Sequence, residues 1–351
     1  MGIVWTSKVA ELAYRFPFKI THGTRHSTPA VFLEIKLGKS TGYGEATLPP
    51  YLKENTESVL CYLRGTAWDK LQTDKDIEKF VFSSEQANHS PCGQTIIEMA
   101  LLDLLGKRQN KNLTQILNIK QHKSSHYSAY TLSLDDEDSW DRRLAVAQNF
   151  SFFKIKLTGQ DDEKQIDFIQ AKVKGSLIID ANQAWHDPEK VLVLIKKLKS
   201  IGAIAIEQPM PVNHWDEYKW VKERSELPII ADESVQFDTD IEKIAQHFHG
   251  INIKPLKFGG IVASHKVILQ AKKLGLLIQL GCMSESSLGC TYNAALLDYA
   301  DFVDLDGPLL LGNDPFVGIT FADDGLIRYP IHAAGIGAGL KNPNFYSPLF
   351  P

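Results

Sequence analysis

The sequence is poor in cysteine, in long apolar runs and in basic segments. Its 351 residues include 4 cysteines without a Cys-x-x-Cys pair, which argues against a zinc site or a disulfide framework and predicts free thiols. The apolar stretch at 274–283 contains Gly and Gln and is shorter than the ~18 residues of a membrane span. A net charge of -4 without a long basic run argues against nucleic acid as a partner. No basic segment followed by an apolar one opens the chain, so we expect no secretory signal and a cytoplasmic protein.

What is present is an ordinary globular composition, with 44% hydrophobic and 23% charged residues in a chain long enough for two domains or one large α/β unit. Residues 1–48 have the pattern of a β-meander, with a polar loop at 21–28 and a strand at 29–37. From 54 to 117 the apolar positions recur at helical spacing, and Gly106 is a candidate helix C-cap. This part of the chain is therefore predicted to be α+β.

After residue 120, short apolar strands alternate with amphipathic helical stretches such as 190–199 and 264–274. The predicted strand ends are 22 to 27 residues apart and fall at Thr131, Lys156, Asp180, Glu207, Asp232, Lys254, Gly281 and Asp304. Such a repeat favours a closed barrel of eight βα units over an open sheet, because no Gly-rich phosphate loop follows the first strand. We expect an N-terminal α+β domain at 1–122, the barrel at 123–311, and a tail at 312–351 that packs on the N-terminal domain.

Three carboxylates end the third, fourth and fifth predicted strands, namely Asp180, Glu207 and Asp232. The C-terminal ends of barrel strands meet at one mouth, so these side chains should lie together. Clustered anions repel one another unless a cation lies among them, and ligands that are all oxygen suit Mg²⁺. A single acid at a strand end is more often a helix cap, but three in succession favour a magnesium site.

Two lysines end the second predicted strand and a third ends the sixth. Lys154 and Lys156 point to the same face because side chains alternate along a strand. Mutual repulsion and a nearby metal should lower their pKa values toward the ~7 to 8 that a base needs. Lys254 faces them across the barrel mouth, so Lys156 and Lys254 could remove a proton next to a carboxylate on one face and return it on the other. Mg²⁺ and Lys154 would stabilise the ene-diolate, and the product would be an epimer.

These residues form five motifs, Lys154-Ile155-Lys156, Asp180-Ala181-Asn182, Glu207-Gln208-Pro209, Asp232-Glu233-Ser234 and Lys254. The set resembles the enolase superfamily in its muconate-lactonizing subgroup, over nearly the whole chain. The resemblance implies a modified (β/α)7β TIM barrel, with an N-terminal α+β capping domain that the C-terminal tail completes. It also implies Lys156 and Lys254 as the acid/base pair, and Asp180, Glu207 and Asp232 as the magnesium ligands.

The segment Asp304-Leu305-Asp306-Gly307-Pro308 resembles the paired-aspartate motif of dipeptide epimerases, a family known for interconverting L-Ala-D-Glu and L-Ala-L-Glu. By that resemblance Asp304 and Asp306 hold the α-ammonium group of the dipeptide. The resemblance further implies that the substrate is lined by Thr131, Cys282, Met283 and Ser284. In glutamate-specific members an arginine of the capping-domain loop pairs with the substrate side chain, and Arg25 is near that position.

The expected activity is Mg²⁺-dependent epimerisation of the C-terminal residue of a dipeptide, either Ala-Glu or a neutral one such as Ala-Ala. One alternative is a cycloisomerase or o-succinylbenzoate synthase of the same subgroup. Another is a metal-free lyase that forms a Schiff base on Lys254. The side-chain preference, the stereochemistry of the first residue, the pathway and the oligomeric state, with a homo-oligomer among the options, stay open.

Overall fold

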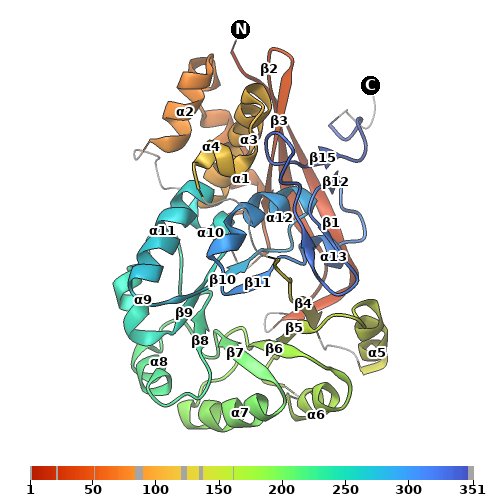
Figure 1. The fold of residues 1–351 in the computed structure, drawn as a ribbon, viewed down its shortest axis with the longest axis vertical. Helices are drawn as coiled ribbons and strands as arrows, with labels where there is room; N and C mark the ends of the chain where they lie inside the picture. The colour runs from red at the N-terminus through yellow and green to blue at the C-terminus, as the bar shows by residue number, and fades with distance from the viewer. Residues whose placement is uncertain are drawn as a thin grey trace.

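The N-terminal segment of the computed structural model forms an antiparallel sheet (Figure 1). The structure describes residues 2–20, 23–50, 52–83, 90–119, 125–133, 137–160 and 162–346. Strands β1 (Val4–Ile20), β2 (Gly23–Leu37) and β3 (Ser40–Thr47) pair in the order β1-β2-β3, which confirms the predicted meander. A β-bulge between Ala13 and Phe18 bends β1.

The predicted polar loop at 21–28 is too long. β1 continues beyond its bulge and pairs Phe18 with Arg25, so residues 23–28 belong to β2. Backbone pairing across the hairpin keeps these polar residues in a strand, although their composition favours a loop. The remaining loop positions, Thr21 and His22, lie outside the described residues.

Helices follow the sheet, and polar caps begin most of them. They are α1 (Thr56–Gly65), η1 (Trp68–Lys70), α2 (Asp74–Phe82), α3 (Pro91–Gln109) and α4 (Leu113–Leu117). The side chains of Asn55, Thr73 and Asn112 accept from the N3 backbone amides of α1, α2 and α4. The prediction of Gly106 as a C-cap is wrong. The helix α3 continues to Gln109 and ends at Asn110, which adopts the left-handed conformation at φ 51°.

The second half of the chain forms the predicted barrel of parallel strands. The strands are β4 (Tyr130–Ser133), β5 (Phe152–Lys156), β6 (Ser176–Asp180), β7 (Ala203–Glu207), β8 (Ile229–Ala231), β9 (Gly250–Ile253), β10 (Leu277–Gly281) and β11 (Phe302–Asp304). They pair in sequence order from β4 to β11. The Ala129 amide donates to the Val303 carbonyl at 2.8 Å and brings the two ends of the sheet together.

Helices on the outside of the barrel connect its strands (Figure 1). They are α5 (Glu137–Val146), α6 (Asp162–Lys172), α7 (Pro188–Ser200), α8 (Trp215–Lys222), α9 (Ile241–His247), α10 (Pro255–Phe258), α11 (Ile261–Lys273), α12 (Ser287–Asn293) and η2 (Ala294–Tyr299). The eighth strand is followed by the short α13 (Gly307–Leu310) in place of a full helix. The architecture is therefore the modified (β/α)7β barrel with an N-terminal α+β domain.

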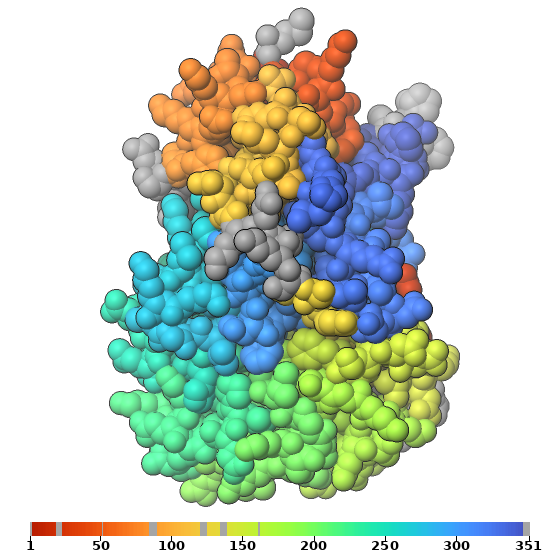
Figure 2. All heavy atoms as spheres, in the orientation of Figure 1, coloured from red at the N-terminus to blue at the C-terminus, as the bar shows by residue number. Residues whose placement is uncertain are grey.

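The C-terminal tail returns to the N-terminal sheet. Its strand β12 (Phe316–Val317) pairs with β15 (Gly339–Leu340), and β13 (Thr320–Phe321) pairs with β14 (Ile327–Arg328). Phe316 stacks on Phe32 of β2 with ring centroids 5.7 Å apart. Figure 2 shows the tail, in blue, against both the red-to-gold N-terminal part and the barrel. Among the described residues, the helices are all too short or too polar to span a bilayer.

Candidate active site

The predicted polar residues meet at one end of the barrel because strand pairing aligns the strand ends. Lys156 is the register partner of Asp180, and Asp180 is the register partner of Glu207. Asp232 follows β8 directly and Lys254 follows β9 directly. The candidate metal ligands and the candidate bases therefore lie on neighbouring strands at the same depth.

Lys154 lies at the centre of this group and is 2% exposed. Its Nζ atom is 2.8 Å from Glu207 Oε2, 2.8 Å from Asp304 Oδ2 and 3.2 Å from Asp180 Oδ2. Burial lowers the pKa of Lys154, but Asp304, Glu207 and Asp180 outweigh burial and raise it well above its ordinary value. The expectation of a lowered pKa is therefore wrong for Lys154. Its neighbours in the structure are mainly carboxylates, and they stabilise the charged amine. Lys154 stays a cation.

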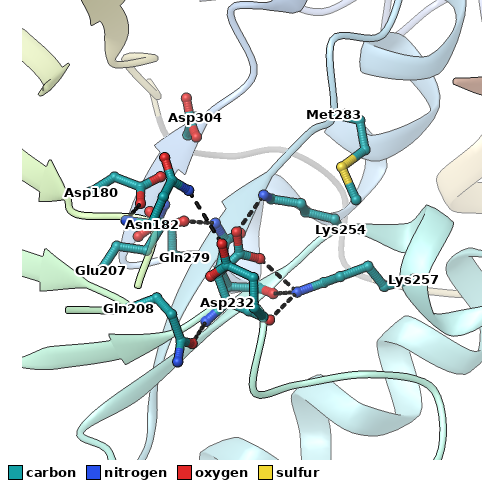
Figure 3. Close-up of polar contacts among 12 residues, drawn as sticks. Asp180, Asn182, Glu207, Gln208, Asp232, Lys254, Lys257, Gln279, Met283 and Asp304 are labelled. Carbon is teal, nitrogen blue, oxygen red and sulfur yellow. Dashed lines mark hydrogen bonds and ion pairs between the residues drawn. The ribbon is translucent and has the colours of Figure 1, made fainter. Parts of the chain in front are cut away.

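Each of the two candidate bases is held by its own carboxylate. Lys156 Nζ donates to Asp180 Oδ2 at 2.7 Å, and Lys254 Nζ donates to Asp232 Oδ2 at 2.7 Å. Three strands separate β5 from β9, so the two lysines enter the mouth from opposite sides of the eight-stranded barrel. Figure 3 shows Asp180 to the left of Asp232 and Lys254 to its right.

Lys257 also contacts the site, and sequence reasoning missed it. Its Nζ atom donates to Asp232 Oδ1 at 2.7 Å, to the Asp232 carbonyl at 2.8 Å and to the Asn252 carbonyl at 3.0 Å. Burial alone would raise the pKa of Asp232, but Lys254 and Lys257 hold it well below its ordinary value. The sequence did contain a signal for Lys257, because a single helical turn brings a lysine three residues after Lys254 back to the same site.

A buried glutamine, Gln208, positions Asp232 and was likewise missed as a functional residue. Its Oε1 atom accepts from the amides of Asp232 at 2.9 Å and Ser234 at 3.1 Å. Gln208, after β7, has a φ of 36°, and Asn182, after the neighbouring strand β6, has a φ of 42°. Left-handed backbone in residues other than glycine costs free energy and often occurs where a site needs a fixed geometry.

Asp304 and Asp306 lie against Thr131 of β4. Asp304 Oδ1 is 3.5 Å from Thr131 Oγ1, and Asp306 Oδ2 accepts from the Thr131 amide at 2.6 Å. Asp304 ends β11, whereas Asp306 lies beyond the strand, before α13. Burial and the neighbouring Asp304 raise the pKa of Asp306 to about 7. Asp304 therefore contacts Lys154 directly, whereas Asp306 is held by the Thr131 backbone amide.

Two other expected substrate-lining residues, Arg25 and Ser284, are connected through Tyr14, between the N-terminal sheet and the segment that follows β10. Arg25 Nη2 donates to Tyr14 OH at 2.6 Å, and Tyr14 OH donates to Ser284 Oγ at 2.7 Å. Met283 is buried, and Cys282 is partly exposed. The four cysteines are free thiols, as predicted. Arg25 lies on a strand, so its side chain is directed by the β1–β2 pairing.

The donor set fits a divalent cation by its chemistry. Among the described residues, no group of three or more His, Cys, Asp or Glu side chains is arranged to enclose a metal ion. In this structure Asp180 and Asp232 are paired with lysines instead. Burial and Asp180 raise the pKa of Glu207 to about 7, which reflects an excess of buried acid. Beside Glu207, Asn252 Oδ1 and Gln279 Oε1 are buried and have no hydrogen-bond partner in the described part of the chain. Oxygen atoms of this kind suit Mg²⁺ and its bound water.

Comparison with known proteins identifies the family. Residues 4–118 match the mandelate racemase / muconate lactonizing enzyme N-terminal domain, and residues 139–342 match the enolase C-terminal domain-like family. The L-Ala-D/L-Glu epimerase of Bacteroides thetaiotaomicron is 33% identical over 328 residues, which are 93% of this chain and 85% of that protein. The L-Ala-D/L-amino acid epimerase of Maribacter sp. is 32% identical over 325 residues, or 91% of this chain and 94% of that protein.

A solved structure extends the likeness to the fold. The dipeptide epimerase of Cytophaga hutchinsonii, complexed with Mg and the dipeptide D-Ala-L-Val, superposes with a TM-score of 0.85 at 25% identity, over 99% of this chain and 98% of that one. The matched family models together span both the N-terminal domain and the barrel. The chain therefore belongs to the mandelate racemase and muconate lactonizing enzyme family of the enolase superfamily, and it is an isomerase.

Proposed function

We propose that the protein epimerises the C-terminal residue of a dipeptide by moving the α-proton between two lysines, Lys156 and Lys254. The observation that carries the proposal is the placement of these amines on opposite sides of the barrel mouth, each 2.7 Å from its own carboxylate. A proton removed by one amine can be replaced by the other on the opposite face of the same carbon, which inverts the configuration. Relatives named as epimerases of Ala-containing dipeptides support the substrate class.

We propose Asp180, Glu207 and Asp232 as the ligands of a Mg²⁺ ion. When bound, Mg²⁺ would supply Lewis-acid stabilisation of negative charge on the substrate carboxylate. Lys154 contributes a fixed positive charge at the same place, because three carboxylates keep it protonated and in position. The structure with Mg from Cytophaga hutchinsonii supports this choice of metal.

For the dipeptide's α-ammonium group, Asp304 and Asp306 are the proposed partners. Both are buried and both contact Thr131 of β4, which supports a shared role for the pair. A cationic terminus would offset the repulsion between the two acids. Arg25, with Tyr14 and Ser284, is proposed to face the substrate side chain. A panel of dipeptides distinguishes a glutamate side chain from a neutral one.

A Schiff-base lyase on Lys254 is the less favoured function. Lys254 Nζ is 2.7 Å from Asp232, one of three neighbouring buried acids, and a metal-free lyase would leave this cluster of acids without a role. Treatment with borohydride and a panel of carbonyl substrates should leave Lys254 unmodified. A trapped adduct, together with activity that survives EDTA, would replace the epimerase proposal with this one.

The direct test incubates a panel of Ala-Xaa dipeptides with the protein and Mg²⁺ in D₂O. We expect deuterium at the α-carbon of the second residue and formation of the opposite epimer, both read by mass spectrometry and NMR. Ala-Glu and neutral dipeptides in the same panel separate the two side-chain classes. Absence of α-deuterium from every dipeptide would end the proposal.

A further inference from the structure

A buried carboxylate of the N-terminal domain reaches the segment that follows Lys254. Glu98 lies on α3, is 2% exposed, and its Oε1 atom accepts from the amides of Ile261 at 2.6 Å and Val262 at 3.2 Å. The Tyr292 hydroxyl also donates to Glu98. These amides begin α11, whose own N-cap residue, Gly260, has no side chain to cap it. Glu98 therefore serves as the N-terminal cap of a barrel helix from another part of the chain.

The same face of α3 holds the short helix between Lys254 and Gly260. Thr95, one helical turn before Glu98, has its hydroxyl 2.8 Å from the Pro91 carbonyl of its own helix and 3.3 Å from the Pro255 carbonyl, so the start of the short helix lies against this face of α3. Within the segment, the Lys257 amide donates to the Lys254 carbonyl at 2.8 Å, and the Gly260 amide donates to the Pro255 carbonyl at 3.1 Å. Lys254 is thus the first residue of a turn whose far end is bound by Glu98.

The glycine that ends this segment is required by the close approach of α3. Gly260 has a φ of 122°, and a Cβ atom there would collide with the Glu98 carboxylate. The contact is thus backbone against carboxylate, with no flexible side chain between them. A displacement of Glu98 would therefore act on the backbone at Gly260 and Ile261, at the far end of the turn that Lys254 begins.

From these contacts we infer that Glu98 is a positioning residue for Lys254, and that it fixes the amine on one side of the barrel mouth without acting on Lys156. This inference rests on the proposed two-base reaction. Lys156 belongs to β5 and is held by Asp180, on the other side of the mouth. Loss of Glu98 should therefore damage one face of the reaction selectively.

The experiment compares α-proton exchange in D₂O for the two epimers of one dipeptide, each supplied separately. Lys254→Ala and Lys156→Ala first identify which epimer depends on which lysine. In Glu98→Leu we expect exchange of the Lys254-dependent epimer to fall by about tenfold to a hundredfold, since a small misplacement of a catalytic group has effects of this size. Exchange of the Lys156-dependent epimer should stay close to wild type. The measured quantity is the ratio of the two rates.

Two further variants provide matched comparisons. Glu98→Gln keeps an oxygen acceptor for the Ile261 amide, so its rate ratio should stay within about twofold of wild type. Glu45→Leu removes an equally buried carboxylate of the same domain, which accepts from the Ser286 amide at 2.8 Å and caps α12 instead of α11. It should change both rates by the same factor, because neither lysine belongs to that segment.

Each outcome decides the inference. A ratio in Glu98→Leu equal to that of wild type would overturn it, as would a common loss in both epimers. If Glu98→Leu does not fold, Tyr292→Phe carries the test. It removes the hydroxyl that donates to Glu98 and also accepts from the Ile261 amide, and it should lower the same ratio to a smaller degree. A wild-type protein that exchanges neither epimer would remove the proposed function, and the inference with it.

Discussion

At the scale of single residues, the role of each lysine follows from the carboxylates around it. Lys154 contacts three acids and keeps its charge, whereas Lys156 donates to Asp180 and Lys254 donates to Asp232. Movement of Lys154 would leave several buried anions uncompensated, so it is fixed in place. In the proposed reaction Lys154 is therefore the permanent cation, and Lys156 and Lys254 are the groups that exchange a proton.

Replacement of Lys254 by alanine should separate epimerisation from exchange. We expect Lys254→Ala to form no opposite epimer, because the proton can no longer be delivered on that face. One epimer should still exchange its α-proton through Lys156, and the reciprocal epimer should exchange in Lys156→Ala. NMR of each dipeptide epimer in D₂O provides both rates. Normal epimerisation by either variant would contradict the two-base scheme.

Removal of one carboxylate should weaken Mg²⁺ binding. A ligand at a hundred times its dissociation constant stabilises a folded protein by about 2.7 kcal/mol, so Mg²⁺ should raise the thermal midpoint of the wild type. Asp180→Asn should lose most of this shift. The control is Asp167→Asn, an acid of α6 that is 73% exposed and should keep the full shift. Equal shifts in both variants would remove Asp180 from the ligand set.

At the scale of helices and strands, a close backbone approach explains the one glycine that the sequence pattern assigns to a helix end. Gly106 lies inside α3, not at its end, and a Cβ atom there would be 2.6 Å from Gly335 Cα and 2.7 Å from the Lys111 carbonyl. The tail and α3 thus meet at their backbones. Gly65, at the end of α1, has open space around its Cβ position.

Alanine at these two glycines should have opposite effects on stability. Gly106→Ala should lower the free energy of unfolding by about 1 to 3 kcal/mol, since neither backbone can yield easily. Gly65→Ala should be neutral or should raise it by up to about 1 kcal/mol, because alanine favours a helix. Urea unfolding of both variants gives the comparison. Equal effects would show that the contact between α3 and the tail is looser than the structure has it.

The elements of the site were predictable where one polar residue follows a buried strand. Asp180, Glu207 and Lys254 could be placed from that pattern, because parallel strands bring their ends together. Gln208 could not be assigned a role, because its contacts depend on left-handed backbone. Lys257 was missed, although its spacing from Lys254 fits a single helical turn. Arg25 was assigned to a loop because its neighbours are polar, whereas strand pairing with Phe18 decides its structure.

At the scale of the whole molecule, the N-terminal domain holds the barrel through buried acids. Glu45 of β3 accepts from the Ser286 amide at 2.8 Å and the Gly289 amide at 3.0 Å, and Glu98 caps α11. Neither acid has a lysine or arginine within ion-pair distance among the described residues. Burial and the nearby Glu285 raise the pKa of Glu45 to about 8. The junction between the two domains is therefore sensitive to protonation.

This junction should lose stability as the pH rises. The pKa of Glu45 is raised from 4.5 to about 8 in the folded protein, so the folded state binds more protons than the unfolded state between these values. Its contribution to stability is complete below pH 4.5 and is lost progressively up to about pH 8. Glu45→Gln cannot ionise, so it should gain on the wild type by up to about 1.4 kcal/mol per pH unit in this window.

Urea unfolding at pH 5, 6.5 and 8 measures the difference between Glu45→Gln and the wild type. The control is Glu57→Gln in α1, a glutamate whose side chain is 72% exposed, and its difference from the wild type should stay constant with pH. A constant difference for Glu45→Gln as well would mean that Glu45 is ionised at no extra cost in the folded protein. In that case the amides of Ser286 and Gly289 would suffice to stabilise the buried anion, and the link between domains would be independent of pH.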